Sequence, residues 1–487
     1  MSETLTDRRA RLMGPNVPTF YRDPVHLVRG EGVWLWDAAG NRYLDAYNNV
    51  PHVGHCHPKV VEAICRRAAT LDTHTRHLHV AVLDYIERPT ATLGHGLSQA
   101  ILVCTGSEAN DIALRMAQAV TGKRGIIATD NTYHGNTTAT SQLSSRRPPI
   151  GGYPPHVRLV PAPDSLRPLG GSADRQAEVF AGHVARAIAD LEDLGIGFSG
   201  MMLCPFFANE GFPRLPKGFF APAAAVIRRA GGLILADEVQ PGFGRLGSHF
   251  WGHDWLGLAP DVMTVGKPMA NGHPVAAVVA RPDVMAAFRE AFGYFNTFGG
   301  NPVSAAACLA TLEVMQDEGL QENARTVGAY ARDRLATLDH PLLAEVRGEG
   351  LFFGAEFVTD ARMTPATDFA ADVVERMRQR GVLMNRIGRH MNTLKIRPPR
   401  RWRFGAARAC RGFSSCARTR CSRWRCPRSA APSCASTAAA TRARMRSVPS
   451  SGGSTRWPTA GLPCPARWSR PTAQPWRILA TGASPRC

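Results

Sequence analysis

The stretch that decides the fold is residues 233–267, which read LILADEVQPGFGRLGSHFWGHDWLGLAPDVMTVGK. It begins with an apolar run, 233–236, that ends abruptly at Asp237. A second apolar run, 262–265, is followed by a glycine and then Lys267. Short, uniformly apolar runs flanked by glycine or proline are typical of strands that are buried on both faces. The stretch therefore predicts two neighbouring strands of an α/β sheet, each followed by a charged residue.

Asp237 and Lys267 are expected at the same edge of this sheet, because parallel strands end at the same edge. Open α/β sheets bind ligands in the crevice outside the carboxyl ends of their strands. An acid that faces a ring nitrogen and an amine that faces a carbonyl would together suit a cofactor site. A salt bridge between two strand ends explains the same two residues, since structural ion pairs are common. From this stretch alone both interpretations stand.

A second ligand-binding signal lies at residues 101–110. Residues 101–104 are predicted to form a buried strand, a Thr-Gly-Ser turn follows, and helical periodicity runs from Ile112 onward. A strand, a Gly-Ser turn and a helix N-terminus make an anion site, because free backbone N–H groups and the helix dipole point at the ligand. Ser107 also fits a helix N-cap, so the turn alone is a weak signal.

Aromatic and histidine side chains lie in two polar loops. Tyr133 and His134 follow a predicted strand at 125–129, where an aromatic ring could stack on a flat cofactor. Ordinary loop packing explains Tyr133 equally well. The histidines at positions 52, 55, 57, 74, 77 and 79 match no common zinc spacing, so the sequence predicts no metal site.

Composition separates the last part of the chain from the rest. The 487 residues carry a formal net charge of +19, but residues 400–487 hold 18 arginines and no lysine, aspartate or glutamate. Residues 1–399 are nearly balanced, with 40 basic and 39 acidic side chains. This distribution argues against a nucleic-acid partner for the main body of the chain. An Arg-rich nucleic-acid-binding arm is the functional alternative for the tail.

Length and apolar content suit one large α/β domain with a smaller partner, since 44% of the 487 residues are apolar. No apolar stretch reaches the roughly 18 residues that predict a membrane span. The first residues show no signal-peptide pattern, so we expect a cytoplasmic protein. Five cysteines precede residue 400, and their scattered, mostly apolar settings predict reduced, buried thiols.

Taken together, these features resemble the class III (ω-amino) aminotransferases, a family of fold-type I pyridoxal-phosphate enzymes. The resemblance runs from about residue 20 to Pro399, with the family's motifs in the family's order and spacing. Each motif alone is weak, but five in order are highly specific. They are 105–110 (TGSEAN), 133–135 (YHG), 236–240 (ADEVQ), 266–268 (GKP) and 296–302 (NTFGGNP).

The resemblance implies a fold and a catalytic pair. The fold is α/β: a large domain with a mostly parallel seven-stranded sheet flanked by helices, and a small C-terminal α/β domain. Lys267 would form an aldimine with pyridoxal 5′-phosphate and then move the proton between Cα and C4′. Asp237 would keep the pyridine nitrogen protonated. The lysine needs a lowered pKa to act as nucleophile and base.

The same resemblance implies how the cofactor phosphate is held and which partners the chain has. Gly106 and Ser107 would bind the phosphate. Thr297 would reach the phosphate of the neighbouring subunit, which implies a homodimer with shared active sites. The other partners would be a small amine or amino-acid substrate and a keto acid.

Four further residues are implied around the cofactor ring. Tyr133 would stack on one face of the ring, and Val239 would pack on the opposite face. Gln240 would approach the ring hydroxyl. His134, the neighbour of Tyr133, is also expected to contact the cofactor.

For activity, the resemblance implies transfer of an amino group from an amine or amino-acid donor to a keto acid. Finer features lean toward the ethanolamine-phosphate and phosphohydroxylysine phospho-lyases and their bacterial relatives. In that branch the same chemistry ends in elimination of phosphate from an amino-alcohol phosphate such as ethanolamine phosphate. Amino transfer is the first interpretation and phosphate elimination the alternative. The finer features are 48–58 (NNVPHVGHCHP), 271–275 (NGHPV) and 364–367 (TPAT).

The chain departs from the family at a substrate gate. Many class III aminotransferases place a Glu after the strand that precedes the central one, where it pairs with a basic residue and admits two kinds of amino donor. Here Cys204 and Pro205 occupy that place, and the nearby Glu210 does not match it. The basic partner, and candidate substrate-binding residue, is Lys395. Without its Glu this lysine is not switched off, which argues against a glutamate-style dual-substrate gate.

The expected organisation has four parts: an N-terminal segment (1–48), a large cofactor-binding domain (49–300), a truncated small domain (301–399) and a tail (400–487). The tail is rich in Arg, Cys and Pro and begins inside a motif, where the family would continue with a strand residue or two and a terminal helix. Absent acidic residues and abundant Arg and Cys are typical of GC-rich DNA translated out of frame. We therefore interpret 400–487 as frameshifted and expect it to be disordered.

Overall fold

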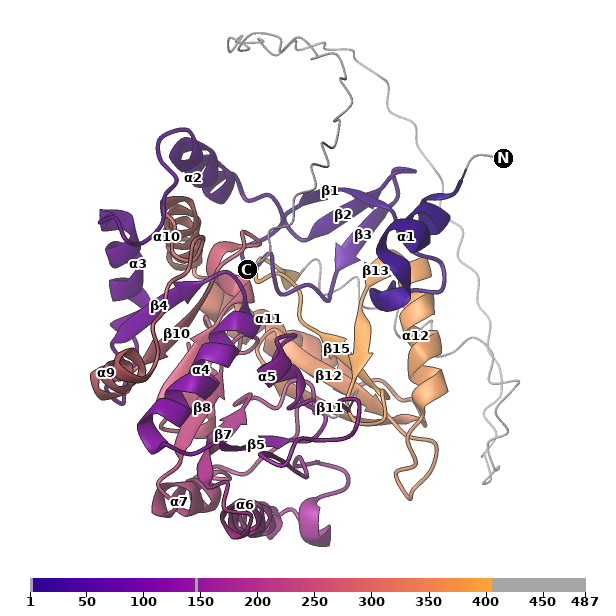
Figure 1. The fold of residues 1–487 in the computed structure, drawn as a ribbon. Coiled ribbons are helices and arrows are strands. Elements are labelled where there is room, and N and C mark those ends of the chain that lie inside the picture. The colour runs from indigo at the N-terminus through magenta and orange to yellow at the C-terminus, as the bar shows by residue number, and fades with distance from the viewer. Residues whose placement is uncertain (1–2, 145–147, 405–487) are drawn as a thin grey trace, which may run out of the picture. The chain divides into compact units, whose positions relative to one another are not determined.

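A computed structural model describes residues 3–144 and 148–404 (Figure 1). Its largest sheet has seven strands in the order β4-β10-β9-β8-β7-β5-β6. Strand β10 is antiparallel to both of its neighbours and the other neighbouring pairs are parallel, which confirms the expected mostly parallel sheet. The strands are β4 (Gln99–Val103), β5 (Gly125–Thr129), β6 (Val157–Val160), β7 (Phe198–Leu203), β8 (Leu233–Asp237), β9 (Val262–Val265) and β10 (Ala276–Ala280).

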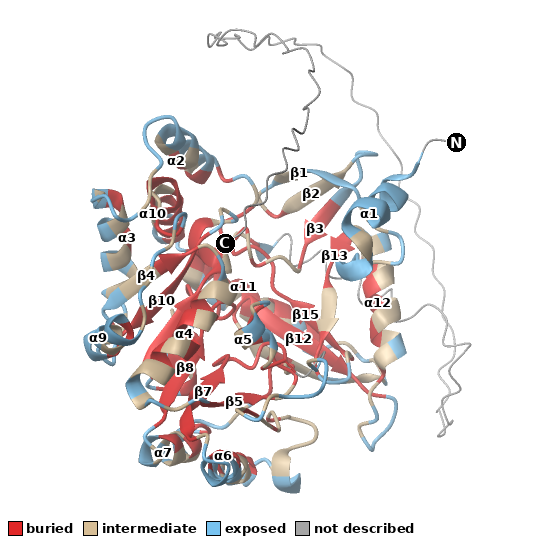
Figure 2. Ribbon diagram, viewed as in Figure 1, coloured by how far each residue is buried: buried red, intermediate tan, exposed pale blue. Residues whose placement is uncertain are grey.

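Strand β8 is uniformly apolar because both of its faces are covered. Leu233 and Leu235 pack on one face with α4 and α9, while Ile234 and Ala236 pack on the other with α6 and α7. Side chains alternate between faces along a strand, so burial on both faces favours a mostly apolar run. Figure 2 shows the inner strands β7, β8 and β10 of this sheet as buried. The helices are α4 (Gly106–Thr121), α6 (Gln176–Asp193), α7 (Ala221–Arg229) and α9 (Pro282–Ala291).

Three further helices cover the sheet near β9 and β10. Met263 and Val265 of β9 and Ala277 and Val279 of β10 share one core with them. The three helices are α2 (Pro58–Ala68), α3 (Val80–Thr90) and α10 (Pro302–Asp317).

None of the helices in the described ranges is long and apolar enough to cross a membrane.

Two smaller sheets share a separate core. One has the order β11-β12-β15-β14 with antiparallel neighbours, and the other has the order β1-β2-β3-β13. Because β13 pairs with β3, Val33 and Leu44 of the N-terminal segment pack with Phe353 and Ile396. The domain boundaries at 48/49 and 300/301 stay predictions. The elements are β1 (Leu27–Glu31), β2 (Trp34–Asp37), β3 (Arg42–Asp45), α11 (Leu320–Ala336), β11 (Leu343–Glu349), β12 (Phe352–Phe357), α12 (Thr367–Gln379), β13 (Val382–Leu383), β14 (Asn385–Ile387) and β15 (Thr393–Ile396), with α1 (Leu5–Met13) before them.

The prediction of buried cysteines is wrong in part. The described cysteines are all free, and Cys204 and Cys308 are buried, but Cys56 and Cys65 are exposed. Cys65 lies on α2, whose buried residues include Ala63. Two positions along a helix is more than half a turn, so Cys65 points away from the face that Ala63 buries. Apolar neighbours in sequence are therefore a poor guide to the burial of a helical cysteine.

The chain continues in the folded core beyond Pro399. Arg400 and Trp402 are both fully buried. The side chain of Asn323 donates hydrogen bonds to their carbonyl oxygens, at 2.6 Å and 2.7 Å. The tail that we expect to be disordered begins at residue 400; its residues 405–487 lie outside the described residues.

Arg400 is a buried guanidinium that lacks an acidic partner among the described residues. Its Nη1 donates to the Phe243 carbonyl at 2.6 Å, whereas Nε and Nη2 have no hydrogen-bond partner there. Burial, and then the charge of Arg245, lower the pKa of Arg400 well below its ordinary value. Arg245 is better satisfied, since it donates to the carbonyl of Pro398 and, at 3.0 Å, to His52 Nδ1. An unpaired buried charge such as that of Arg400 destabilises the fold.

Replacing Arg400 with methionine should therefore stabilise the protein. Arg400→Met keeps a long side chain and removes the unpaired charge, for an expected gain on the order of 1–3 kcal/mol in the free energy of unfolding. Arg245→Met is the matched control and should destabilise, because buried acceptors lose their donor. Denaturant unfolding of both variants measures this. An equal loss of stability in the two would contradict the prediction.

Candidate active site

The charged residues at the carboxyl ends of β8 and β9 lie at one cavity of about 100 Å³. Asp237 is the last residue of β8, and Lys267 begins a 3₁₀ turn, Lys267–Ala270, just after β9. Eight of the ten residues expected at the site line this cavity, and Thr297 and Lys395 do not. The lining residues are Gly106, Ser107, Asn110, Tyr133, His134, Gly135, Asp237, Val239, Gln240 and Lys267.

Asp237 is only 6% exposed, and its two oxygens have different partners. Oδ2 accepts hydrogen bonds from His134 Nδ1 at 2.7 Å and from Asn110 Nδ2 at 3.0 Å. Oδ1 accepts one bond, from the backbone N–H of Val239 at 3.1 Å. The protein therefore occupies Oδ2 fully, while Oδ1 retains a lone pair for a donor in the cavity.

Lys267 lies in surroundings that favour its neutral form. Burial, and then the positive charge of Arg397, lower its pKa from 10.5 to about 8, against the opposite influence of Asp237. Its backbone φ of 22° is unusual for a residue with a side chain. Among the described residues, Asp237 pairs with His134 and forms no salt bridge with Lys267. The alternative of a strand-end salt bridge is therefore not realised.

The turn before α4 has the form of an anion site. Thr105 is the N-cap, and its side chain accepts a hydrogen bond from the N–H of Glu108. Ser107 is therefore not the cap, and its Oγ accepts from the backbone N–H of Asn136 at 3.1 Å. A Cβ at Gly135 would lie 2.7 Å from Ser107, so a glycine is needed for this close approach. The first N–H groups of a helix have no partner within it, which leaves donors beside the cavity.

The loop after β5 supplies one accessible ring and one buried ring. Tyr133 is 42% exposed, and its hydroxyl donates to Asn136 Oδ1 at 2.9 Å. His134 is buried, and its Nε2 lies 3.1 Å from Thr132 Oγ1 while its Nδ1 bonds to Asp237. Tyr133 is thus available to cover a ligand, whereas His134 orients the carboxylate of Asp237.

Gln240 connects the cavity to two cations. Its Oε1 accepts hydrogen bonds from Lys395 Nζ at 2.9 Å and from Arg397 Nη1 at 2.8 Å. The guanidinium of Arg397 also lies 4.4 Å from the ring centroid of Tyr47. In the described part of the chain, Arg397 forms no ion pair and its Nε has no hydrogen-bond partner. The cations therefore share a neutral amide.

Glu210 does not oppose these cations. Thr129 Oγ1 donates to Glu210 Oε1 at 2.7 Å, and the backbone N–H of Asn209 donates to Oε2 at 3.0 Å. Burial raises the pKa of the Glu210 carboxyl. Cys204, which follows β7, is buried and carries no charge that would balance Arg397.

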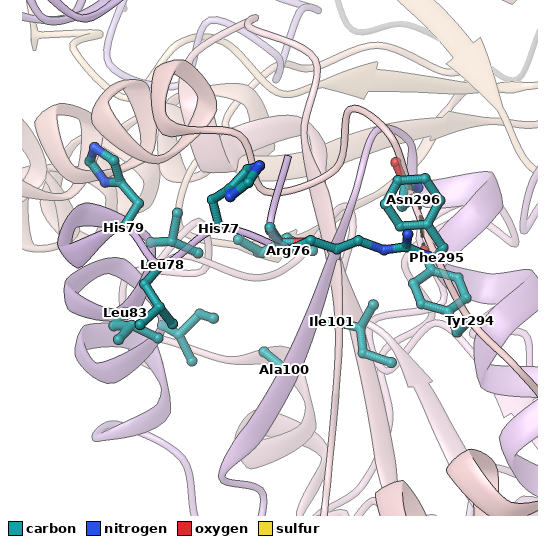
Figure 3. Close-up of a pocket in the computed structure, with 14 residues that line it drawn as sticks. Arg76, His77, Leu78, His79, Leu83, Ala100, Ile101, Tyr294, Phe295 and Asn296 are labelled. Atoms are coloured by element: carbon teal, nitrogen blue, oxygen red, sulfur yellow. Dashed lines mark hydrogen bonds between the residues drawn. The ribbon is translucent and has the colours of Figure 1, made fainter. Parts of the chain in front are cut away.

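Thr297 lies apart from the cavity, in an exposed loop between α9 and α10. The same loop carries Phe295 and Asn296, which help to line a second pocket of about 350 Å³ (Figure 3). Arg76 extends toward these residues, and its guanidinium lies 4.0 Å from the ring centroid of Phe295. Leu78, at the same pocket, is 98% exposed.

The sequence interpretation missed two residues of this region. Asn110 lines the cavity, and its signal is a polar residue on a helix face whose other members are buried and apolar. Arg397 follows Lys395 by two positions. Side chains two apart in an extended chain lie on the same side, so the spacing alone could have paired them.

The fold and this cavity define a pyridoxal-phosphate enzyme of fold type I. The sequence model described as "Aminotransferase class-III" matches residues 19–407. The chain belongs to the class III aminotransferase family, and its cofactor is pyridoxal 5′-phosphate. The match extends a few residues beyond Pro399, the last residue of the resemblance in the sequence.

The names of similar proteins refer to two activities, amino transfer and phosphate elimination. "Alanine--glyoxylate aminotransferase 2-like" of Drosophila melanogaster is 38% identical over 416 residues, which cover 82% of this chain and 84% of that protein. "Ethanolamine-phosphate phospho-lyase homolog 1" of Caenorhabditis elegans is 36% identical over 418 residues, which cover 82% and 89%. A solved phospholyase from Arthrobacter in complex with phosphoethanolamine has a TM-score of 0.82 and 40% identity, and the match covers 85% of this chain and 100% of that chain.

Apoprotein should incorporate pyridoxal 5′-phosphate faster as the pH rises through about 8. The pKa of Lys267 is lowered to about 8, so its neutral, nucleophilic fraction grows across that range. The growth of the visible absorbance of bound cofactor measures the rate. Lys267→Ala is the control and should never develop the native band. A rate that rises only above about pH 10, the range of an ordinary lysine, would contradict the prediction.

Proposed function

We propose that this enzyme eliminates phosphate from a small amino-alcohol phosphate such as ethanolamine phosphate. The observation that carries the proposal is Arg397, a buried cation beside the cavity whose known contacts are neutral. A buried charge without a counter-charge is costly, so a substrate with an anionic group would supply the missing partner. The solved phospholyase with phosphoethanolamine, at 40% identity, supports this substrate class.

The residues of the cavity fit the cofactor. The N–H groups at Gly106 and Ser107 would hold its phosphate. A Cβ at Gly106 would lie 3.1 Å from Val239 Cγ2, so Val239 packs against this turn and would bound one face of the ring. Tyr133 would cover the other face. Asp237 Oδ1 accepts a single hydrogen bond from the protein, so it would accept a second one from the protonated ring nitrogen.

Different residues of the chain then handle the protons at the substrate and at the cofactor ring. Bound pyridoxal 5′-phosphate supplies an electron sink for the carbon that carries the substrate amine. Lys267 Nζ takes the proton from that carbon, and Asp237 keeps the ring nitrogen protonated. Gln240 Oε1 accepts hydrogen bonds from the two cations. Its Nε2 donates one hydrogen to Asn209 Oδ1 at 3.4 Å and keeps a second hydrogen for the ring hydroxyl. Arg397 binds the phosphate as the C–O bond breaks, and hydrolysis of the remaining unsaturated amine gives an aldehyde and ammonia.

Amino transfer between small acids is the second candidate, and the same arginine favours it. A guanidinium pairs with a carboxylate as well as with a phosphate. Because no carboxylate among the described residues opposes Arg397, an amino-acid donor and a keto-acid acceptor would both bind through their carboxylates. Relatives in Drosophila melanogaster and Homo sapiens named as alanine–glyoxylate aminotransferases support this class of substrate.

Phosphate release from phosphoethanolamine by the holoenzyme should identify the reaction. Arg397→Ala should lower kcat/KM by about 10- to 100-fold, the loss expected for a hydrogen bond to a charged group, with the cofactor still bound. Arg289→Ala, at an exposed position of α9, is the matched control and should leave kcat/KM unchanged.

Other outcomes decide between the two candidates. Conversion of the cofactor to its amine form by alanine, with no phosphate released from phosphoethanolamine, would replace elimination by amino transfer. An Arg397→Ala enzyme with full kcat/KM on both substrates would contradict the anionic subsite itself.

We further propose a homodimer with shared active sites. Leu78, Leu83 and Phe295 line the second pocket and are 98%, 55% and 44% exposed, and the nearby Phe298 is 71% exposed. Exposed apolar side chains gathered at one pocket are typical of an interaction site. Thr297 lies in the same loop as Phe295 and Phe298, outside the cavity of its own chain. A second copy seated here would bring Thr297 to the partner's cofactor phosphate.

Leu78→Asp should therefore weaken both self-association and cofactor binding. A charge in the apolar interface would disfavour the dimer, and the loss of the dimer would remove Thr297 from the partner site. Light scattering and cofactor titration measure the two effects. Leu194→Asp, at a 56% exposed leucine after α6, is the matched control. A Leu78→Asp protein that remains dimeric with native cofactor affinity would contradict the shared site.

Location stays a prediction. A relative in Arabidopsis thaliana, 35% identical over 407 residues, is named as mitochondrial, which does not decide between the cytoplasm and an organelle for this chain. The Arg-rich segment that could serve another partner lies outside the described residues from 405 onward.

A further inference from the structure

Asn110 is a buried polar side chain that lines the cavity. It lies near the start of α4 and is only 1% exposed. Its neighbours on the buried side of the helix, such as Ala109 and Ile112, are apolar. A polar side chain in such a place destabilises the fold unless its hydrogen-bonding groups are satisfied.

The amide of Asn110 uses both donors and its acceptor. Nδ2 donates to the His134 carbonyl at 2.7 Å and to Asp237 Oδ2 at 3.0 Å. Oδ1 accepts from Thr264 Oγ1 at 2.6 Å. The His134 carbonyl and the Asp237 carboxylate can only accept, so they fix which end of the amide faces Asp237, while Thr264 holds the oxygen end in place. If the amide turned over, its oxygen would face the carboxylate, and the hydrogen bond would become a repulsion.

These bonds connect the three parts of the site that must act together. The helix that carries Asn110 begins at Gly106 and Ser107, the anion turn. Asp237 ends β8, and Thr264 lies on β9, three residues before Lys267. One side chain thus links the anion turn, the acid and the segment that leads to the lysine.

We propose that Asn110 is a positioning residue for the cofactor and that the hydrogen bond from Thr264 holds its amide in place. The inference rests on the proposed roles of Asp237 and of the anion turn, but not on which substrate the enzyme uses. By occupying Oδ2, Asn110 leaves Oδ1 of Asp237 for the ring nitrogen. By its place on α4, it also sets the spacing between Asp237 and the phosphate site. A rigid cofactor can satisfy both contacts only at a matched spacing.

Thr264 offers a test that leaves every proposed cofactor contact in place. Thr264→Val conserves side-chain size and removes the hydroxyl that holds the amide. Apoprotein with this change should bind pyridoxal 5′-phosphate about tenfold more weakly, the scale of one orphaned hydrogen bond. The visible spectrum of the bound cofactor should also change. Thr264→Ser keeps the hydroxyl and should restore both the affinity and the spectrum.

Thr311→Val is the matched control for the loss of a buried hydroxyl. Thr311 is 1% exposed, does not line the cavity, and donates to Ala307 of its own helix at 2.8 Å. This variant should bind the cofactor with native affinity and a native spectrum. Thermal unfolding of each apoprotein, measured alongside, separates a change in stability from a change at the site.

Two results would overturn the proposal. One is native affinity and a native spectrum in Thr264→Val. The other is equal weakening in Thr264→Val and Thr311→Val, which would show a general effect of stability. If Thr264→Val does not fold, Asn110→Ala is measured in the same way and judged by the same results. Cofactor binding needs no substrate, so failure of the phosphate-release assay would leave this test intact.

Discussion

The hydrogen-bonded carboxylate of Asp237 is the constraint on which the rest of the site depends. It stands at the end of a strand whose side chains are buried on both faces, and a charge in such a place needs partners. His134 and Asn110 supply two of them, so the loop after β5 and the helix α4 are both fixed to β8. The anion turn at the start of α4 and the lysine after β9 then face one cavity. A requirement to satisfy one carboxylate thus determines where three segments meet.

The parts of the fold and of the site that the sequence predicts are those whose signals lie in one short stretch of residues. The apolar runs at 233–236 and 262–265 predicted β8 and β9, because a strand covered on both faces is mostly apolar. The residues that follow these runs, Asp237 and Lys267, are therefore placed at one edge by the sequence pattern alone. The phosphate-binding turn could be predicted only with the family motif at 105–110. A strand followed by a glycine and a serine is equally typical of a helix start with Ser107 as the N-cap. Thr105 takes that role instead.

What the sequence did not reveal depends on contacts between distant segments. Strand β6 lies within 145–175, a region whose many Pro and Gly residues are typical of irregular loops, yet pairing with β5 makes it a strand. The roles of Asn110 and His134 arise from partners more than a hundred residues away, at Asp237. Exposure of Cys65 depends on which side of α2 meets the core. The hydrophobic periodicity of the sequence predicts none of these three features. Each depends on how elements that are distant in sequence pack together, and periodicity describes one element at a time.

Two buried arginines near the end of the described chain differ in whether a ligand could balance their charge. Arg397 and Arg400 both lack a carboxylate partner among the described residues, and burial of such a charge is unfavourable in either case. Arg397, however, bonds to Gln240 at the edge of the cavity, where an anionic substrate would supply the missing charge. Arg400 bonds to a backbone carbonyl, and neither pocket described above includes it. The cost at Arg397 therefore has an explanation in binding, whereas that at Arg400 has none. This contrast falls where a shift of reading frame was inferred from composition, just after Pro399.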